Sequence, residues 1–148
     1  MRAASISAVI LCMLAVCLPS SARDESIPQL LARAEAARPE DQPPLYTELA
    51  ERRLHNADDL YNEGKVDEAE AAVTDVVSYS EKASQAATQT GKRLKNTEIS
   101  VRKMAEKLRD IKRSLAFEDQ PPVQAAIDRL ESVRTGLLNH MFGKGSKR

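Results

Sequence analysis

The sequence predicts an all-α protein, and three observations support this prediction. The 148 residues are 42% hydrophobic and 30% charged but only 3% aromatic, with five glycines and no tryptophan. Sandwiches and doubly wound sheets need runs of β-branched and aromatic residues, so this composition argues against them. Apolar residues recur at helical spacing, and prolines stand where helices would begin. One helical domain is therefore expected.

The N-terminal residues predict a signal peptide over 1–22. Arg2 precedes an apolar run at 8–18, which is followed by Pro19 and the small residues at 20–22. This order matches the three regions of a secretory signal. The run is too short for a stable membrane anchor, which needs about 20 residues. We expect cleavage after position 22 and export to a bacterial periplasm or the medium, with no transmembrane span in the mature chain.

Two alternatives to cleavage remain open for this segment. The peptide could stay attached as a short anchor, or Cys17 could carry a lipid, because residues 14–17 resemble a bacterial lipobox. Both cysteines, Cys12 and Cys17, precede the expected cleavage site, so the mature chain would contain no disulfide. We expect one helical domain over 23–142 and a basic tail over 143–148.

The first two helices are predicted from their prolines and apolar stripes. A short helix opens at Pro28 and ends before Pro39. A second helix opens at Pro43 and Pro44 and ends at Gly64, which suits the position after a helix. Its apolar stripe consists of Leu45, Tyr46, Leu49, Ala57, Leu60 and Tyr61.

The third predicted element is one long central helix over 66–117. A coiled-coil-like spacing of three and four residues continues through this range without a proline. Gly91 is expected to be the least stable position of this helix. The surrounding segment 86–96 is expected to be a bare waist, meaning a stretch that neither flanking helix covers and on which a partner helix could pack. The alternative is a four-helix up-and-down bundle in which the chain turns back at Gly91.

The last predicted helix opens at Pro121 and Pro122 and ends at Gly143. Its stripe consists of Val123, Ala126, Ile127, Leu130, Val133, Leu137, Leu138 and Met141. On length, the helix at 44–63 would fold back on the first half of the long helix, and the helix at 122–142 would fold back on the second half.

Residues 60–69 (LYNEGKVDEA) resemble the turn of a tetratricopeptide repeat. Ala57, Gly64 and Ala69 occupy its small-residue positions, and the similarity extends over 49–83. One repeat length after Ala69 stands Lys103, and no second copy follows. The resemblance therefore implies a single helical hairpin and no peptide-binding array. The whole pattern is also similar to bacterial secreted helical domains of unknown function.

No catalytic, cofactor or metal site is predicted, and the protein is not expected to be an enzyme. Glu51, His55 and Asp59 follow at intervals of four residues, a spacing that could hold a metal, but they lie opposite the apolar stripe. Arg53 and Arg134 fall within apolar stripes. Each is expected to pair with a carboxylate of the long helix; a clamp for a ligand carboxylate is the alternative.

The charge distribution gives the main indication of function. Residues 24–81 carry 15 acidic and 5 basic side chains, whereas 82–117 carry 3 acidic and 10 basic ones. The basic stretch has no aromatic residue for base stacking until Phe117, so a nucleic acid partner is not expected. The candidate partner-binding residues are Lys92, Arg93, Lys95, Arg102 and Lys103.

Two functions are compatible with this layout. The first is a non-enzymatic extracytoplasmic interaction or adaptor protein that binds a protein partner or a second copy of itself. The second is a binding module whose basic helix face holds an anionic envelope component, such as lipid head groups or an acidic polymer.

Overall fold

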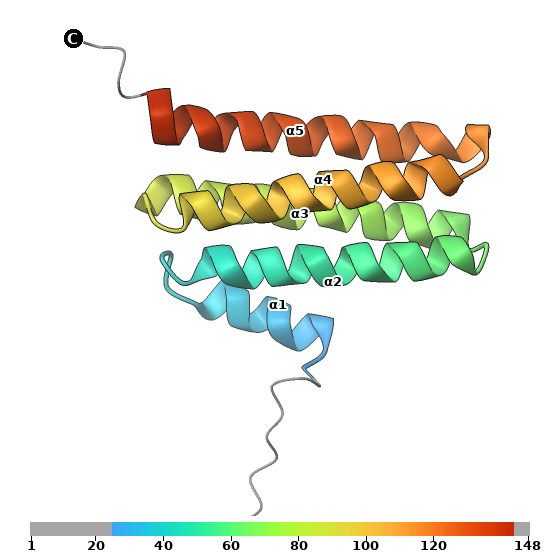
Figure 1. Ribbon diagram of the computed structural model, residues 1–148. Coiled ribbons are helices and arrows are strands. Elements are labelled where there is room, and N and C mark those ends of the chain that lie inside the picture. Colours follow the sequence, from blue (N-terminus) through green and yellow to red (C-terminus); the bar gives the residue numbers. More distant parts are fainter. Residues whose placement is uncertain (1–24, 144–148) are drawn as a thin grey trace, which may run out of the picture.

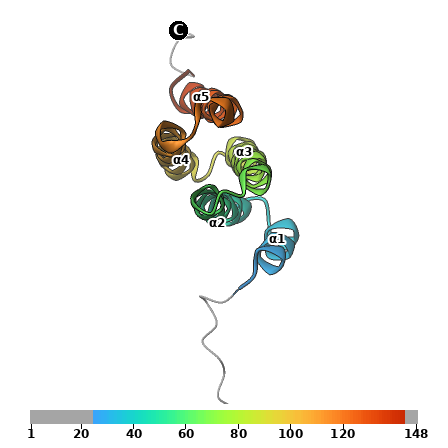
Figure 2. The same ribbon diagram turned by 90° about the vertical axis from the view of Figure 1, so that its right-hand side faces the viewer.

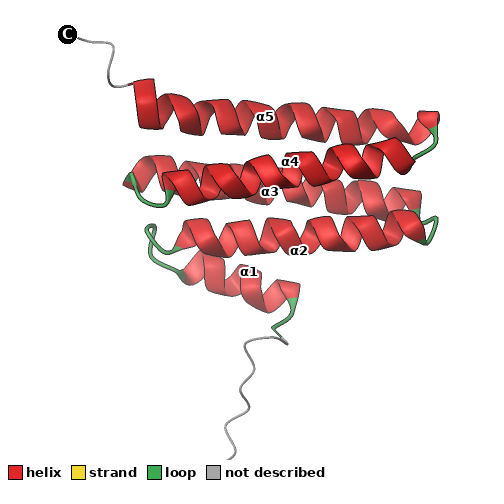
Figure 3. Ribbon diagram, in the orientation of Figure 1, coloured by secondary structure: helices red, strands yellow, loops and turns green. Residues whose placement is uncertain are grey.

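The computed structural model describes residues 25–143, and within this range the chain folds into helices and short connections (Figure 3). The elements are α1 (Ile27–Ala36), α2 (Gln42–Asn62), α3 (Val66–Thr90), α4 (Leu94–Ser114), the 3-10 helix η1 (Phe117–Asp119) and α5 (Gln120–Phe142). No strand occurs in the described part, which confirms the all-α prediction. The predicted signal peptide and the residues after Gly143 lie outside the described range.

Helices α2 to α5 form an up-and-down bundle of two antiparallel hairpins. One hairpin is α2–α3 and the other is α4–α5, and Figure 1 shows the four helices running alternately in opposite directions. In the end view they occupy four corners, with α2 and α5 furthest apart (Figure 2). Helix α1 packs on the outside of α2.

The predicted helix starts follow from local capping chemistry. At α1, Ser26 Oγ accepts from Gln29 N across 3.4 Å, and Gln29 Oε1 accepts from Ser26 N across 3.0 Å. This reciprocal pair is a capping box that satisfies two free backbone donors. Prolines stand in the first turn of α1, α2 and α5, where their missing N–H has no cost.

The continuous long helix over 66–117 was a wrong prediction, and the bundle broken at Gly91 is the correct alternative. Helix α3 ends at Thr90, Gly91 adopts a left-handed φ of 68°, and α4 begins at Leu94. The 3–4 spacing predicts which face is buried, and that face is the same whether the chain runs straight or turns back. The expected bare waist is also wrong, because Ala86 and Ala87 are 4% and 0% exposed.

The core consists mainly of aliphatic side chains, as the scarcity of aromatic residues predicts, and Tyr46 and Tyr79 are its aromatic members. Its largest fully buried side chains come from every long helix and α1, and include Leu30, Leu49, Val76, Leu108, Leu130 and Leu137. The single helical hairpin expected over 49–83 is formed by α2 and α3. Its turn places Gly64 at φ 75° and is closed by Lys65 N donating to Leu60 O across 2.9 Å.

Candidate interaction surfaces

The predicted basic residues gather where the chain turns from α3 into α4. Lys92, Arg93 and Lys95 are exposed on this turn and the first turn of α4, and Lys103 is exposed further along α4. Among residues 25–143, none of these four has an ion-pair partner. We call Lys92, Arg93, Lys95 and Lys103 the basic turn surface.

Arg102, the fifth predicted residue, is used inside the fold. Its Nη1 lies 3.2 Å from Glu106 Oε1, and its Nε lies 4.0 Å from Glu98 Oε1. Its side chain is 38% exposed. Arg102 therefore stands apart from the four cations of the basic turn surface.

Two other cations of α4 pair with carboxylates of neighbouring helices. Lys107 Nζ lies 2.6 Å from Asp58 of α2, and Arg109 Nη2 lies 2.7 Å from Glu131 of α5. Lys112 Nζ donates to the Gln124 side-chain carbonyl across 2.6 Å. Gln124 is uncharged, so Lys112 has no ion-pair partner among the described residues. Of the cations in 82–117 without such a partner, Lys92, Arg93 and Lys95 lie at or next to the α3–α4 turn.

Arg53 and Arg134 pair with carboxylates of the helices that follow residue 66, as predicted from their positions. Arg53 Nε lies 3.0 Å from Asp75 Oδ2 on α3, without the alignment of a hydrogen bond. Arg134 Nε donates to Glu98 Oε1 on α4 across 2.7 Å. The hydrogen bond to Glu98 raises the pKa of the Arg134 guanidinium.

The row of Glu51, His55 and Asp59 lies on the exposed side of α2. His55 Nε2 is 3.7 Å from Asp59 Oδ2, and the two side chains are 81% and 55% exposed. In the described part of the chain, no group of three histidine, cysteine or acidic residues is arranged to hold a metal ion.

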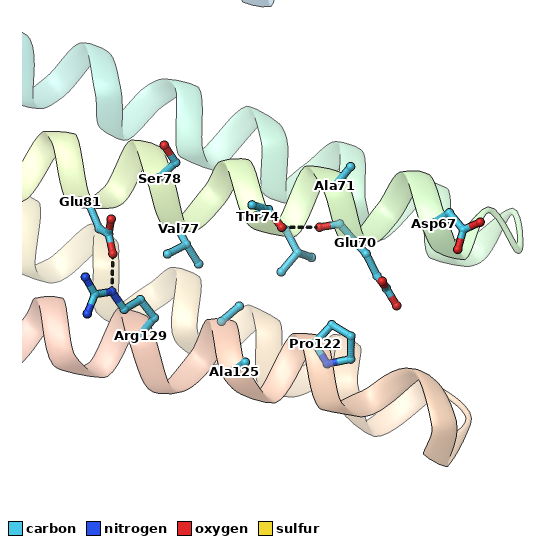
Figure 4. A pocket seen from close by; sticks show the side chains of 12 residues that line it. Asp67, Glu70, Ala71, Thr74, Val77, Ser78, Glu81, Pro122, Ala125 and Arg129 are labelled. Carbon is cyan, nitrogen blue, oxygen red and sulfur yellow. Dashed lines mark hydrogen bonds and ion pairs between the residues drawn. The ribbon is translucent and has the colours of Figure 1, made fainter.

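A groove of about 600 Å³ lies between α3 and α5, in the half of the bundle next to the α2–α3 and α4–α5 connections. Its floor is apolar, with Val73, Val77, Pro122, Ala125 and Ala126. Figure 4 shows side chains of α3 and α5 facing one another across it. We call this feature the α3–α5 groove.

The rim of the α3–α5 groove is acidic. Glu81 is paired with Arg129 at one end, whereas Asp67 and Glu70 lie toward the other (Figure 4). Within the described range, neither Asp67 nor Glu70 has an ion-pair partner. Thr74 Oγ1 donates to the backbone carbonyl of Glu70 across 3.0 Å.

Tyr61 of α2 lies near this acidic end. Its hydroxyl is buried and has no hydrogen-bond partner among the described residues. Burial, followed by the charges of Glu70 and Asp119, raises the pKa of Tyr61 to about 12. The environment therefore favours the neutral phenol and disfavours any further negative charge.

A second, smaller cleft of about 190 Å³ lies between α2 and α4, where the side chains are mostly polar. Its lining includes Glu48, Glu51, Arg93 and Ser100. Arg93 thus belongs to the basic turn surface and also lines this cleft.

Sequence reasoning missed the α3–α5 groove because the apolar stripes assigned Val73 and Ala126 to the core without showing which helices would be neighbours. The sequence does contain a signal for this groove. Ala71 and Ala125 are small apolar residues beside those stripes, and both are exposed. Small side chains at the edge of two facing stripes leave a hollow between the helices.

A model of the family described as Domain of unknown function (DUF5667) matches residues 31–118. The matched range covers α2, α3 and α4 and ends before α5. Comparison with curated proteins and with solved structures gives no match. No helix in the described part of the chain is both long and apolar enough to span a membrane.

Proposed function

This chain belongs to the family described as Domain of unknown function (DUF5667), and from that premise we propose that it is a non-enzymatic helical adaptor protein. The observation that carries the proposal is the α3–α5 groove, which combines an apolar floor with the carboxylates of Asp67 and Glu70, neither of which has an ion-pair partner among residues 25–143. Apolar grooves of this kind accept an amphipathic helix or an extended segment. Charge complementarity selects a partner segment with small apolar side chains flanked by lysine or arginine.

The basic turn surface supplies a second point of attachment. It lies at the α3–α4 connection, the end of the bundle away from the α2–α3 connection where the groove begins (Figure 1). Two surfaces of opposite charge on separate parts of one rigid bundle suit a protein that joins two partners. In this proposal the tetratricopeptide-like α2–α3 hairpin supplies one wall of the groove.

A fluorescent synthetic helical peptide tests the groove, with alanine and leucine on one face and lysine on the other. We expect it to bind the protein, and the double substitution Asp67→Lys and Glu70→Lys to abolish binding. The matched control is Glu51→Lys with Asp59→Lys, which changes the net charge equally on the exposed side of α2. Equal loss of binding in the control, or retained binding in the groove variant, would contradict the proposal.

The second candidate is a module for anionic envelope components, and the unpaired cations of the basic turn surface favour it. Vesicles of phosphatidylglycerol mixed with phosphatidylcholine serve as the probe. We expect sedimentation with these vesicles to weaken steeply as salt is added. Reversal of Lys92, Arg93, Lys95 and Lys103 to glutamate should eliminate it, whereas reversal of Arg113, an exposed cation at the far end of α4, should not.

We also propose that the protein is exported, which the N-terminal sequence supports. The expected mature chain begins at Arg23, and intact-mass measurement of protein from its own host checks this. A retained N-terminus or a lipid on Cys17 would instead place the bundle at a membrane surface.

A further inference from the structure

We propose that this chain exchanges helical hairpins with a second copy of itself. The bundle opens at residues 91–93, and the α4–α5 hairpin of one copy packs on the α2–α3 hairpin of the other. This inference does not depend on ligand binding in the groove.

The bundle is built from two units that meet along incomplete seams. Within each hairpin the two helices are antiparallel neighbours (Figure 1). Between the hairpins, the α3–α5 seam contains the groove of about 600 Å³, and the α2–α4 seam contains the cleft of about 190 Å³. The boundary between the hairpins is therefore the less completely packed one.

Exchange would recreate the contacts between the hairpins that opening removes. The ion pairs that bridge the hairpins are Arg129 with Glu81 and Lys107 with Asp58. Both would form again between two chains, because the second copy presents the same surfaces. A second copy is thus the partner whose fit to an opened hairpin is already shown by the closed bundle.

The connection between the hairpins is short and conformationally strained. It comprises Gly91, Lys92 and Arg93, and both Gly91 and Arg93 have left-handed φ angles, 68° and 63°. Glycine adopts this conformation freely, but arginine has a Cβ that disfavours it. Straightening the hinge would relieve Arg93, and strained short hinges favour exchange between copies.

The spacing of the apolar residues allows residues 91–93 to continue as a regular helix when the hinge straightens. Ala83, Ala87 and Thr90 before the turn continue the same 3–4 spacing as Leu94, Thr97 and Val101 after it. No proline lies between Val66 and Ser114. The opened chain would then form one helix about 74 Å long at about 1.5 Å per residue, with both apolar faces on one side.

Two substitutions in the hinge test the proposal in opposite directions. Gly91→Ala strains the closed turn, and a Cβ at this position meets nothing within 4 Å, so only the backbone is affected. Arg93→Gly relaxes the same turn. Measured by light scattering after refolding at high concentration, the dimer-to-monomer ratio should rise about 5- to 30-fold per hinge in Gly91→Ala and fall by a similar factor in Arg93→Gly.

A distance measurement identifies the form of the dimer. Spin labels are attached to Glu68→Cys and Asp110→Cys in residues 23–148, which contain no other cysteine, and the labelled chain is refolded with excess unlabelled chain. Both positions lie near the same end of the closed bundle, so monomer labels should be less than about 30 Å apart. In an exchanged dimer the 42 intervening steps of one helix separate them by about 63 Å.

Three results would overturn the proposal. The first is a dimer whose intrachain label distance stays below about 30 Å, since its hinge would be closed. The second is a folded, purely monomeric Gly91→Ala protein by circular dichroism and light scattering. If Gly91→Ala does not fold, the comparison of wild type with Arg93→Gly decides, and an equal or higher dimer fraction in Arg93→Gly is the third.

Discussion

Arg134 of α5 donates from Nε to Oε1 of Glu98 on α4 across 2.7 Å, at a carboxylate whose side chain is only 11% exposed. The contact joins the two helices of the second hairpin and gives the buried Glu98 carboxylate a charged hydrogen-bond donor. Arg102 lies 4.0 Å from the same oxygen and contributes less directly.

Replacing only one partner of this ion pair should lower the stability more than replacing both partners. We expect Arg134→Met to lower the urea midpoint because it leaves the Glu98 carboxylate buried without its hydrogen bond. The double variant Arg134→Met with Glu98→Leu should recover part of the loss. Additive losses would show that the two residues act independently.

Leu108 anchors α4 in the core, and its side chain is 0% exposed. Leu108→Ala should lower the free energy of unfolding by about 2–5 kcal/mol through lost burial and the cavity that remains. Phe117 is the matched control, because it is 85% exposed. Phe117→Ala should change stability by less than about 0.5 kcal/mol in the same denaturant titration.

Substitution of two glycines by alanine should change the stability of the protein in opposite directions. Gly64 has a φ of 75° in the α2–α3 turn, so Gly64→Ala should destabilise the protein by about 1 kcal/mol. Gly136 lies inside α5, and a Cβ there meets nothing within 4 Å. Gly136→Ala should therefore stabilise the protein by about 0.5–1 kcal/mol. Thermal unfolding of both variants checks the pair, and shifts in the same direction would contradict the backbone argument.

The buried Tyr61 hydroxyl predicts a loss of stability at high pH. Its pKa is raised from 10.0 to about 12, so the folded state holds the proton more tightly than the unfolded chain. The resulting stability is fully present below pH 10 and is lost as the pH rises through 12. Absorbance titration should detect this late phenol ionisation.

Tyr61→Phe provides the test of that assignment. The variant should lose the late ionisation, and at neutral pH it should gain about 1 kcal/mol because an unpaired hydroxyl leaves the interior. Tyr46 and Tyr79 also have raised pKa values, chiefly because they are buried. Some loss at high pH should therefore remain. A Tyr61→Phe protein less stable at neutral pH would mean that the hydroxyl has a partner.

The helices could be predicted from the sequence because their ends carry local signals. Pro28, Gly64 and Gly143 mark ends that the structure reproduces, and the stripes identify the buried faces. The turn at Gly91 could not be decided in this way. A 3–4 spacing is satisfied equally by a straight helix and by two antiparallel ones, and the choice depends on contacts between α3, α4 and α5 that are distant in sequence.

The candidate surfaces were predictable only in part for the same reason. Arg53 and Arg134 stood out because an arginine within an apolar stripe needs a carboxylate. The pairing of Lys107 with Asp58 joins two hairpins, and no local sequence pattern indicates it. The sequence therefore overstates how much positive charge in 82–117 is available to bind a partner. To predict the α3–α5 groove, one must know that the helix edges carrying Ala71 and Ala125 face each other.

The walls of that groove come from different hairpins, α3 from the first and α5 from the second. A molecule seated between them holds the hairpins together and, by mass action, disfavours the opened intermediate through which exchange must pass. The closed monomer and the exchanged dimer would contain the same groove, so the occupant would bind both equally. Occupancy would therefore slow the interconversion of the two forms and leave their equilibrium ratio unchanged. The occupant of the groove would thus control how fast the dimer forms, and not how much of it forms.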